Sequence, residues 1–284
     1  MNHPSNQPPW YEDHDITIYN QDAYTFAKTL PTNHIDCIVT SPPYWKLRDY
    51  NSPQQWGREN TIGEYVDHLV TLFAMLRPKI KNDATIWLNL GDTRLDRQAC
   101  GIPWRVAHDL QADGWHIRQD IIWVKPNAMP ESVDDRPAGN YEHVFLISKT
   151  PHHRFNLDPI RVQYDGDRAP SRRARSGHTN KPTSATAAWS GDHPGRNPGS
   201  VWSIPVQPFK DAHSAVMPMA LAERCVLAGS SVGDVVCDPF HGSGTTAAAA
   251  LKLGRRYVGT DVSEEYLRLS LRTRLKNGAL PLFT

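Results

Sequence analysis

One continuous stretch, Val235–Asp261, constrains the fold of this chain more than any other. It reads VVCDPFHGSGTTAAAALKLGRRYVGTD, an apolar strand pattern followed by a glycine-rich turn, an alanine-rich helix pattern and a second strand pattern. Gly242 and Gly244 allow a ligand to approach the backbone, and the alanines allow the helix to pack closely on a sheet. Asp261 ends the second strand about 20 residues after the first glycine, where an acid can bind ribose hydroxyls. The stretch therefore predicts a nucleotide-type site on an α/β sheet.

Three kinds of ligand could use this loop. A P-loop needs lysine after its last glycine, and Thr245 stands there. The spacing of Gly242, Gly244 and Ala247 satisfies a loose dinucleotide fingerprint, so NAD is an alternative. Asp238, on the approach to the loop, would repel a pyrophosphate but suits a cationic ammonium and sulfonium. We therefore favour S-adenosylmethionine over NAD and over a glycine turn without a ligand.

Strand and helix patterns alternate along most of the remaining chain. We expect strands at 15–20, 34–40, 84–92, 117–126 and 141–149, and helices at 23–30, 64–80, 103–115, 217–229 and from residue 263. Such alternation predicts an α/β fold with a doubly wound, mostly parallel sheet.

The segment 150–205 interrupts this alternation. It has hardly any apolar run, many Pro, Gly and Ser residues, and a series of basic side chains. These are Arg168, Arg172, Arg173, Arg175, Lys181 and Arg196. We therefore divide the chain into residues 1–149 and 206–284, two halves of one domain, with 150–205 as an inserted region. A disordered linker is the alternative, but a loop this long inside a compact domain is uncommon unless it has a function.

Composition excludes several classes of protein. No stretch approaches the roughly 18 apolar residues of a membrane span, and no signal-peptide pattern is visible. The four cysteines form no C-x-x-C, which indicates core thiols in a reduced, cytoplasmic compartment. The 13 histidines show no metal-ligand spacing, so we expect no metal site. The net charge of +1 neither suggests nor excludes a nucleic-acid partner.

A second motif, TSPPYW at residues 40–45, follows an apolar strand pattern. Two consecutive prolines end the strand and leave a loop with few N–H donors. The loop presents the Ser41 hydroxyl, the Pro42 carbonyl and the Tyr44 ring. Such a loop suits a target that brings its own hydrogen-bond donors.

With TSPPYW, DPFHGSGTT and GTDVSEEY in this order, the chain resembles the DNA amino-methyltransferases of restriction–modification systems. It is similar to the permuted (beta) group, in which the catalytic motif precedes the cofactor motif. The resemblance implies a Rossmann-like, S-adenosylmethionine-dependent methyltransferase fold with an inserted target-recognition region. If the strands that precede the two motifs are neighbours at the point where strand order reverses, their loops face one crevice, and we expect this arrangement.

The resemblance also implies roles for individual residues. The catalytic loop comprises Ser41, Pro42, Pro43 and Tyr44. Around the cofactor, Asp238, Phe240, Gly242 and Gly244 correspond to the loop at its methionine part and Asp261 to the acid at its ribose. Asp22 corresponds to the acid that meets the adenine, although a helix N-cap is an equal interpretation. The family supplies only the position of the recognition region, in which Arg172, Arg173 and Arg175 are the expected DNA contacts.

The expected reaction follows from the chemistry of an exocyclic amino group, whose lone pair is delocalised into the ring. Ser41 Oγ and the Pro42 carbonyl can accept its two N–H groups and aim the lone pair at the sulfonium methyl. Tyr44 can stack on a base that has been flipped out of duplex DNA. In this family SPPY usually accompanies N4 of cytosine, with N6 of adenine as the alternative.

Other functions are weaker candidates. Cytosine-C5 methylation needs a cysteine nucleophile, in that family within a Pro-Cys pair, and no cysteine follows proline here. An NAD-dependent oxidoreductase and an inactive DNA-binding protein are retained from other classes. The expected partners are double-stranded DNA and a cognate restriction endonuclease acting on the same site, with no membrane.

Overall fold

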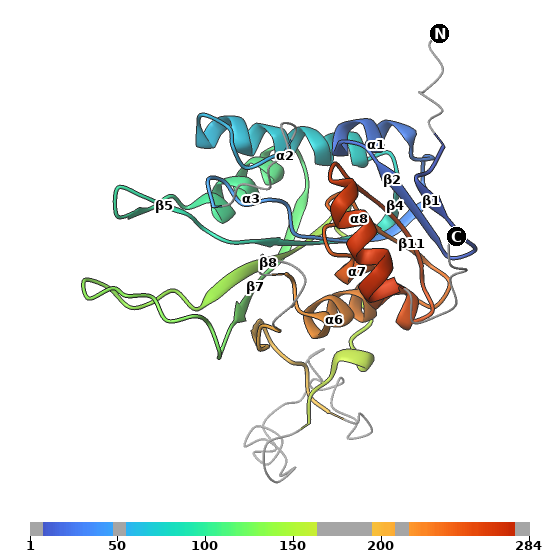
Figure 1. The fold of residues 1–284 in the computed structure, drawn as a ribbon. Helices are drawn as coiled ribbons and strands as arrows, with labels where there is room; N and C mark the ends of the chain where they lie inside the picture. Colours follow the sequence, from blue (N-terminus) through green and yellow to red (C-terminus); the bar gives the residue numbers. More distant parts are fainter. Residues whose placement is uncertain (1–7, 48–54, 164–194, 208–215, 276–284) are drawn as a thin grey trace, which may run out of the picture.

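The computed structural model describes residues 8–47, 55–163, 195–207 and 216–275 and centres on a nine-stranded sheet (Figure 1). The strand order is β1-β2-β11-β10-β3-β4-β8-β7-β9. The strands are β1 Tyr11–Glu12, β2 Ile16–Asn20, β3 Ile35–Thr40, β4 Ile80–Leu90, β7 His116–Val124, β8 Tyr141–Ser148, β9 Val201–Ser203, β10 Val235–Asp238 and β11 Arg256–Asp261. A separate hairpin joins β5 Arg94–Leu95 to β6 Gln98–Ala99.

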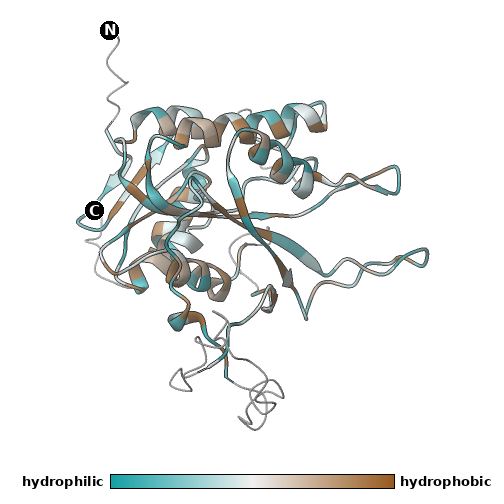
Figure 2. Cartoon of the chain, turned by 180° about the vertical axis from the view of Figure 1, so that it is seen from behind, coloured by the Kyte–Doolittle hydropathy of each residue, from teal (hydrophilic) through white to brown (hydrophobic). Residues whose placement is uncertain are grey.

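Helices cover both faces of this sheet (Figure 1). One face carries α1 Ala23–Thr29, α2 Ile62–Leu76 and α3 Ile102–Ala112, and the other carries α6 Met219–Gly229, α7 Thr245–Lys252 and α8 Glu264–Ser270. Asp158–Ile160 forms a 3-10 turn and Leu271–Leu275 a π-helical turn. The central strands are buried on both sides, and Figure 2 shows hydrophobic residues along them. On β10, Val235 and Cys237 face one core and Val236 faces the other.

Most strand pairs of the sheet are parallel. The run β2-β11-β10-β3-β4 is parallel throughout, β8 is antiparallel to both β4 and β7, and β9 is parallel to β7. The predicted α/β fold with a mostly parallel, doubly wound sheet is confirmed. The expected core cysteines are also confirmed, since all four are buried with free thiols.

The predicted neighbours are side by side. Strand β10 pairs with β3 through Val236↔Cys37 and Cys237↔Ile38. The chain continues from β10 to β11 in one direction and from β3 to β4 in the other, so the order of strands reverses between β10 and β3. The loops that follow these two strands therefore emerge together at one edge of the sheet.

Some expected boundaries were wrong. Helix α2 begins at Ile62, behind a capping box made by Thr61 and Glu64, and ends at Leu76 rather than Ile80. Pro78 explains the early end, because proline has no N–H to donate to the carbonyl four residues before it, so the helical hydrogen bonds stop at Arg77. The chain instead enters β4 at Ile80, four residues before the expected start of that strand.

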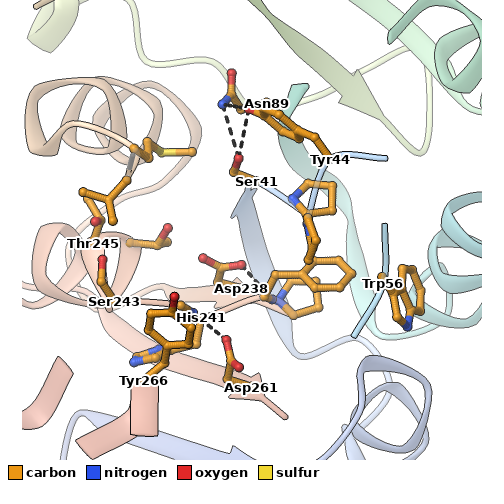
Figure 3. A pocket seen from close by; sticks show the side chains of 18 of the residues that line it. Ser41, Tyr44, Trp56, Asn89, Asp238, His241, Ser243, Thr245, Asp261 and Tyr266 are labelled. Atoms are coloured by element: carbon orange, nitrogen blue, oxygen red, sulfur yellow. Dashed lines mark hydrogen bonds between the residues drawn. The ribbon is translucent and has the colours of Figure 1, made fainter. Parts of the chain in front are cut away.

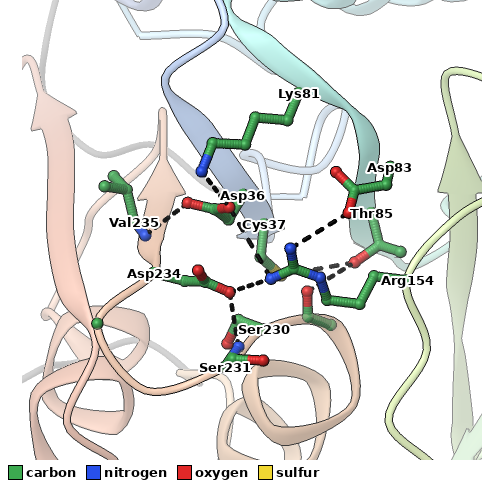
Figure 4. A network of polar contacts seen from close by, with 12 residues as sticks. Asp36, Cys37, Lys81, Asp83, Thr85, Arg154, Ser230, Ser231, Asp234 and Val235 are labelled. Carbon is green, nitrogen blue, oxygen red and sulfur yellow. Dashed lines mark hydrogen bonds and ion pairs between the residues drawn. The ribbon is translucent and has the colours of Figure 1, made fainter.

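The described residues at the two ends of the segment 150–205 contact the central sheet. At the amino end of the sheet, Arg154 forms ion pairs with Asp234 and, at 3.2 Å, with Asp83 (Figure 4). At the other end of the segment, Trp202 on β9 stacks on Trp87 with ring centroids 6.0 Å apart. Arg196 is described and makes a β-bridge with Val162. The division of the chain at 150 and 205 stays a prediction, and Arg168, Arg172, Arg173, Arg175 and Lys181 lie outside the described residues.

Candidate active site

A cavity of about 310 Å³ opens at the carboxyl ends of β3 and β10. Both sequence motifs line it, with Ser41 to Tyr44 on one side and Asp238 to Ser243 on the other (Figure 3). Residues about 200 positions apart in sequence thus share one site because their strands are neighbours.

Asp238 ends β10 with its carboxylate held in one orientation. Its Oδ1 accepts hydrogen bonds from Thr40 Oγ1 at 2.7 Å and from the backbone N–H of Phe240 at 3.0 Å. Burial raises the pKa of Asp238 to about 7, and the hydrogen bond from Thr40 partly opposes that rise. A buried carboxylate of this kind is stabilised in its charged form by a cationic ligand.

Asp261 joins the end of β11 to the glycine loop. Its Oδ2 accepts from the backbone N–H of Gly242 at 2.7 Å and its Oδ1 from that of Ser263 at 2.9 Å. Burial raises its pKa, while these backbone hydrogen bonds lower it. Each carboxylate oxygen retains acceptor capacity, which suits a pair of hydroxyl groups such as a ribose diol.

The two glycines of the loop have different surroundings. Gly242, at φ +52°, lines the cavity. Gly244, at φ +80°, precedes α7 and is not among the cavity-lining residues; a Cβ there would lie 2.7 Å from Cβ of Ser270. Gly244 thus permits close packing against the helix at 264–270, and a direct role for it in ligand binding stays a prediction.

Asp22 caps helix α1 and does not line the cavity. Its Oδ1 accepts from the backbone N–H groups of Tyr24 and Thr25, both at 3.0 Å. The N-cap interpretation describes these contacts, and a role at an adenine stays a prediction. The preceding residue, Gln21, does line the cavity, and its side-chain amide nitrogen and oxygen are both buried without a partner. An unpaired buried amide, with an NH2 donor group beside a carbonyl acceptor, matches the edge of an adenine.

Two aromatic rings form a further part of the cavity wall. Phe240, which the sequence predicted, meets Trp56 with ring centroids 5.1 Å apart at 67°. Trp56 lies in the loop between β3 and α2. The two rings offer an apolar surface to a flat ligand.

Contacts of Pro43 and Tyr44 hold the loop of Ser41 to Tyr44 in place. The Pro43 carbonyl accepts a hydrogen bond from Tyr65 Oη of α2 at 2.9 Å. The Tyr44 ring packs against Gly91 so closely that a Cβ at Gly91 would lie 2.6 Å from a ring carbon. Glycine after β4 is therefore required by the position of this ring. Trp45 is buried, so it packs in the core and does not line the cavity.

Three further polar side chains, Asn89, Glu142 and Lys125, extend the contacts of Ser41 and Tyr44 at the cavity. Asn89 of β4 places Nδ2 3.3 Å from Ser41 Oγ and 2.7 Å from Tyr44 Oη. Tyr44 Oη donates to Glu142 of β8 at 2.5 Å, and Lys125 donates to the same carboxylate. Burial and the Glu142 charge raise the pKa of Tyr44 well above its usual value. Sequence reasoning assigned no role at the site to Lys125, Asn89 or Glu142. The available signal for Asn89 is a polar residue within an apolar, buried stretch of β4.

Neither a metal cluster nor a membrane span is found in the part of the chain that the structure describes. There, no group of three or more His, Cys, Asp or Glu side chains could hold a metal ion. No helix of these residues is long and apolar enough to cross a membrane.

Comparison with known proteins places this geometry in a family. The DNA methylase family model, N6_N4_Mtase, matches residues 35–272. The chain belongs to this family. It is similar to the Type II methyltransferase M.SmaI of Serratia marcescens, with 37% identity over 278 residues covering 88% of this chain and 87% of that protein. It is also similar to M.Cfr9I of Citrobacter freundii, with 34% identity over 284 residues covering 90% and 86%.

Solved structures show the same fold. The PvuII DNA methyltransferase (cytosine-N4-specific) superposes with a TM-score of 0.74 at 18% identity, covering 97% of this chain and 92% of that one. The complex of M1.HpyAVI with SAM gives a TM-score of 0.56 at 21% identity, covering 92% and 99%. The expected membership of the restriction–modification DNA methyltransferases is confirmed, and the chain is a DNA methyltransferase.

Proposed function

We propose that this DNA methyltransferase transfers a methyl group from S-adenosylmethionine to N4 of a cytosine flipped out of duplex DNA. The observation that carries the proposal is the meeting of two loops at one cavity. One loop presents the acceptor Ser41, and the other presents the buried carboxylate of Asp238. A similar fold is found in a methyltransferase named as cytosine-N4-specific. The permuted group is proposed because the catalytic loop precedes the cofactor loop in the chain.

The cofactor is S-adenosylmethionine, and the residues present fit its three parts. The unpaired amide of Gln21 suits the adenine edge, and Asp261 suits the ribose hydroxyls. Asp238 suits the cationic methionine end, because a positive charge favours the ionised form of a buried carboxyl group. The bound cofactor supplies a methyl group activated by a sulfonium.

The chain's own residues position the amino group of the base. Ser41 Oγ and the Pro42 carbonyl accept its two N–H groups, so its lone pair is directed at the methyl group. Positioning of this kind can contribute roughly 7–11 kcal/mol. The amino group of adenine presents the same arrangement of donors, and N6-adenine is therefore the second candidate. Arg172, Arg173 and Arg175 are the proposed DNA contacts, and a cognate restriction endonuclease is a proposed partner in the system.

Mass spectrometry of nucleosides tests the proposal. Duplex DNA and RNA are each incubated with the protein and methyl-labelled S-adenosylmethionine, and the nucleosides of each are separated. We expect label in N4-methylcytosine, and none with Ser41→Ala. Label only in N6-methyladenine would refute the choice of base, and label only in RNA would refute the choice of substrate. DNA binding without any transfer would leave the inactive DNA-binding protein as the answer.

A further inference from the structure

Five side chains beside the cavity form one connected hydrogen-bond chain, of which Figure 3 labels Ser41, Tyr44 and Asn89. Ser41 Oγ lies 3.3 Å from Tyr44 Oη, and Tyr44 Oη donates to Glu142 Oε2 at 2.5 Å. Asn89 Nδ2 lies 2.8 Å from the same Oε2. Lys125 Nζ donates to the other carboxylate oxygen, Oε1, at 2.5 Å. The hydrogen-bond chain ends at the carboxylate of Glu142, and the Glu142 side chain is only 14% exposed.

The direction of this chain follows from counting hydrogens. A hydroxyl group has one hydrogen, and a carboxylate has none. The Tyr44 hydrogen is used on Glu142, so Tyr44 can only accept from Ser41. The Ser41 hydrogen therefore points to Tyr44, and Ser41 Oγ is left with lone pairs alone for other partners.

Glu142 also sets the orientation of the Asn89 amide. With Nδ2 toward Glu142, the amide donates; turned over, it would place Oδ1 against a carboxylate oxygen. In this orientation Nδ2 also lies 2.7 Å from Tyr44 Oη and 3.3 Å from Ser41 Oγ. Its two hydrogens are used on the two shorter contacts, to Glu142 and Tyr44, so the lone pairs of Ser41 Oγ stay available to another donor. Lys125 supplies the charge that balances the partly buried carboxylate.

We infer that Glu142 is a positioning residue that makes Ser41 a hydrogen-bond acceptor toward the target amino group. The inference rests on the proposed function. Glu142 does not touch the target base in this account; it acts through Tyr44 and Asn89. The direction of the chain favours a base that offers N–H groups at this position and disfavours one that offers a carbonyl oxygen, as uracil would.

The test uses Glu142→Gln, Tyr44→Phe and the double variant. A glutamine nitrogen facing Tyr44 donates to it, which frees the Tyr44 hydrogen to point at Ser41 and reverses the chain. Tyr44→Phe keeps the ring but removes the hydroxyl group that connects Ser41 to Glu142. At saturating cofactor and DNA, we expect each single variant to lose about tenfold or more in the single-turnover methylation rate. Because both changes break one chain, the double variant should be no slower than the slower single variant.

A measurement of cofactor affinity and a matched control variant distinguish the loss of a positioning residue from a general disturbance of the fold. S-adenosylmethionine affinity, measured by calorimetry, should match wild type in all three variants. Asp120→Asn is the control, because Asp120 pairs with His143 at 3.0 Å on the same β7–β8 pair and does not line the cavity. Its rate should equal that of wild type.

Three results would overturn the inference: an unchanged rate in Glu142→Gln, multiplicative losses in the double variant, or a loss of cofactor affinity that accounts for the loss of rate. Failure of the wild-type protein to methylate DNA would instead overturn the proposed function. An active wild type with an equally active Glu142→Gln would overturn this inference alone.

Discussion

Cofactor affinity should depend on pH through Asp238. Burial raises the pKa of this carboxyl group to about 7, well above its ordinary value, so it gains a proton as the pH falls through that value. Only the ionised form attracts a cationic ligand, whose sulfonium keeps its charge at every pH and whose amine is mostly protonated below about pH 7.5. The apparent dissociation constant then scales with the inverse of the ionised fraction.

The expected change in cofactor affinity follows directly from this pKa. With a pKa of about 7, the ionised fraction falls from about three quarters at pH 7.5 to about one tenth at pH 6.0. The dissociation constant for S-adenosylmethionine should therefore rise about eightfold across this range. Isothermal titration calorimetry at four pH values measures it.

Two variants assign the titration to this carboxyl group. Asp238→Asn should bind weakly, with an affinity that is independent of pH between 6.0 and 7.5. Thr40→Val removes the hydrogen bond that favours the ionised form, so the midpoint should move to higher pH. A constant affinity in wild type would refute the reasoning. The same slope in Asp238→Asn would do so as well, because another group, such as Asp261, would then be titrating.

Three further predictions address the cofactor, the reaction and the DNA. Gln21→Ala should weaken S-adenosylmethionine binding roughly tenfold by calorimetry, with unchanged turnover at saturating cofactor; unchanged affinity would remove Gln21 from the adenine site. Methylation should survive excess EDTA, since the leaving group is already cationic; loss of activity with rescue by one divalent ion would contradict this. Replacing Arg172, Arg173 and Arg175 by alanine should weaken DNA binding and lower the log–log salt slope by roughly 0.9 per phosphate contact. An unchanged slope, affinity and specificity would remove them from the DNA surface.

The sequence was sufficient to predict the centre of the fold. The loop 238–244 is expected to bind the cofactor and the motif at 40–45 to bind the target base. Because the two ligands must meet for methyl transfer, we expected the preceding strands to be neighbours. Strand β10 does pair with β3. Alternating strand and helix patterns were sufficient to predict a sheet with a layer of helices on each face. Amphipathic helices cover a sheet whose central strands are buried on both faces.

The sequence did not predict residues whose position depends on the register between strands or on very short elements. Glu142 reaches Tyr44 only because β8 pairs with β4 in the register Asn89↔Val144, and periodicity does not give the register between strands. Strand β9 has three residues, too few for a pattern, and it was expected only as the end of an inserted segment. Gln21 was overlooked because Asp22 offered a better-known side chain, whereas the fold turns Gln21 into the cavity.

The most direct test of cytosine-N4 methylation is to express the protein in a bacterial host without DNA methylation and to sequence the host genome by a method that identifies modified bases. We expect N4-methylcytosine at the same position of one short recognition sequence throughout the genome, and none in cells that express Ser41→Ala. N6-methyladenine at such a sequence would contradict the assignment to cytosine, and a genome without methylated bases would contradict the proposed activity itself.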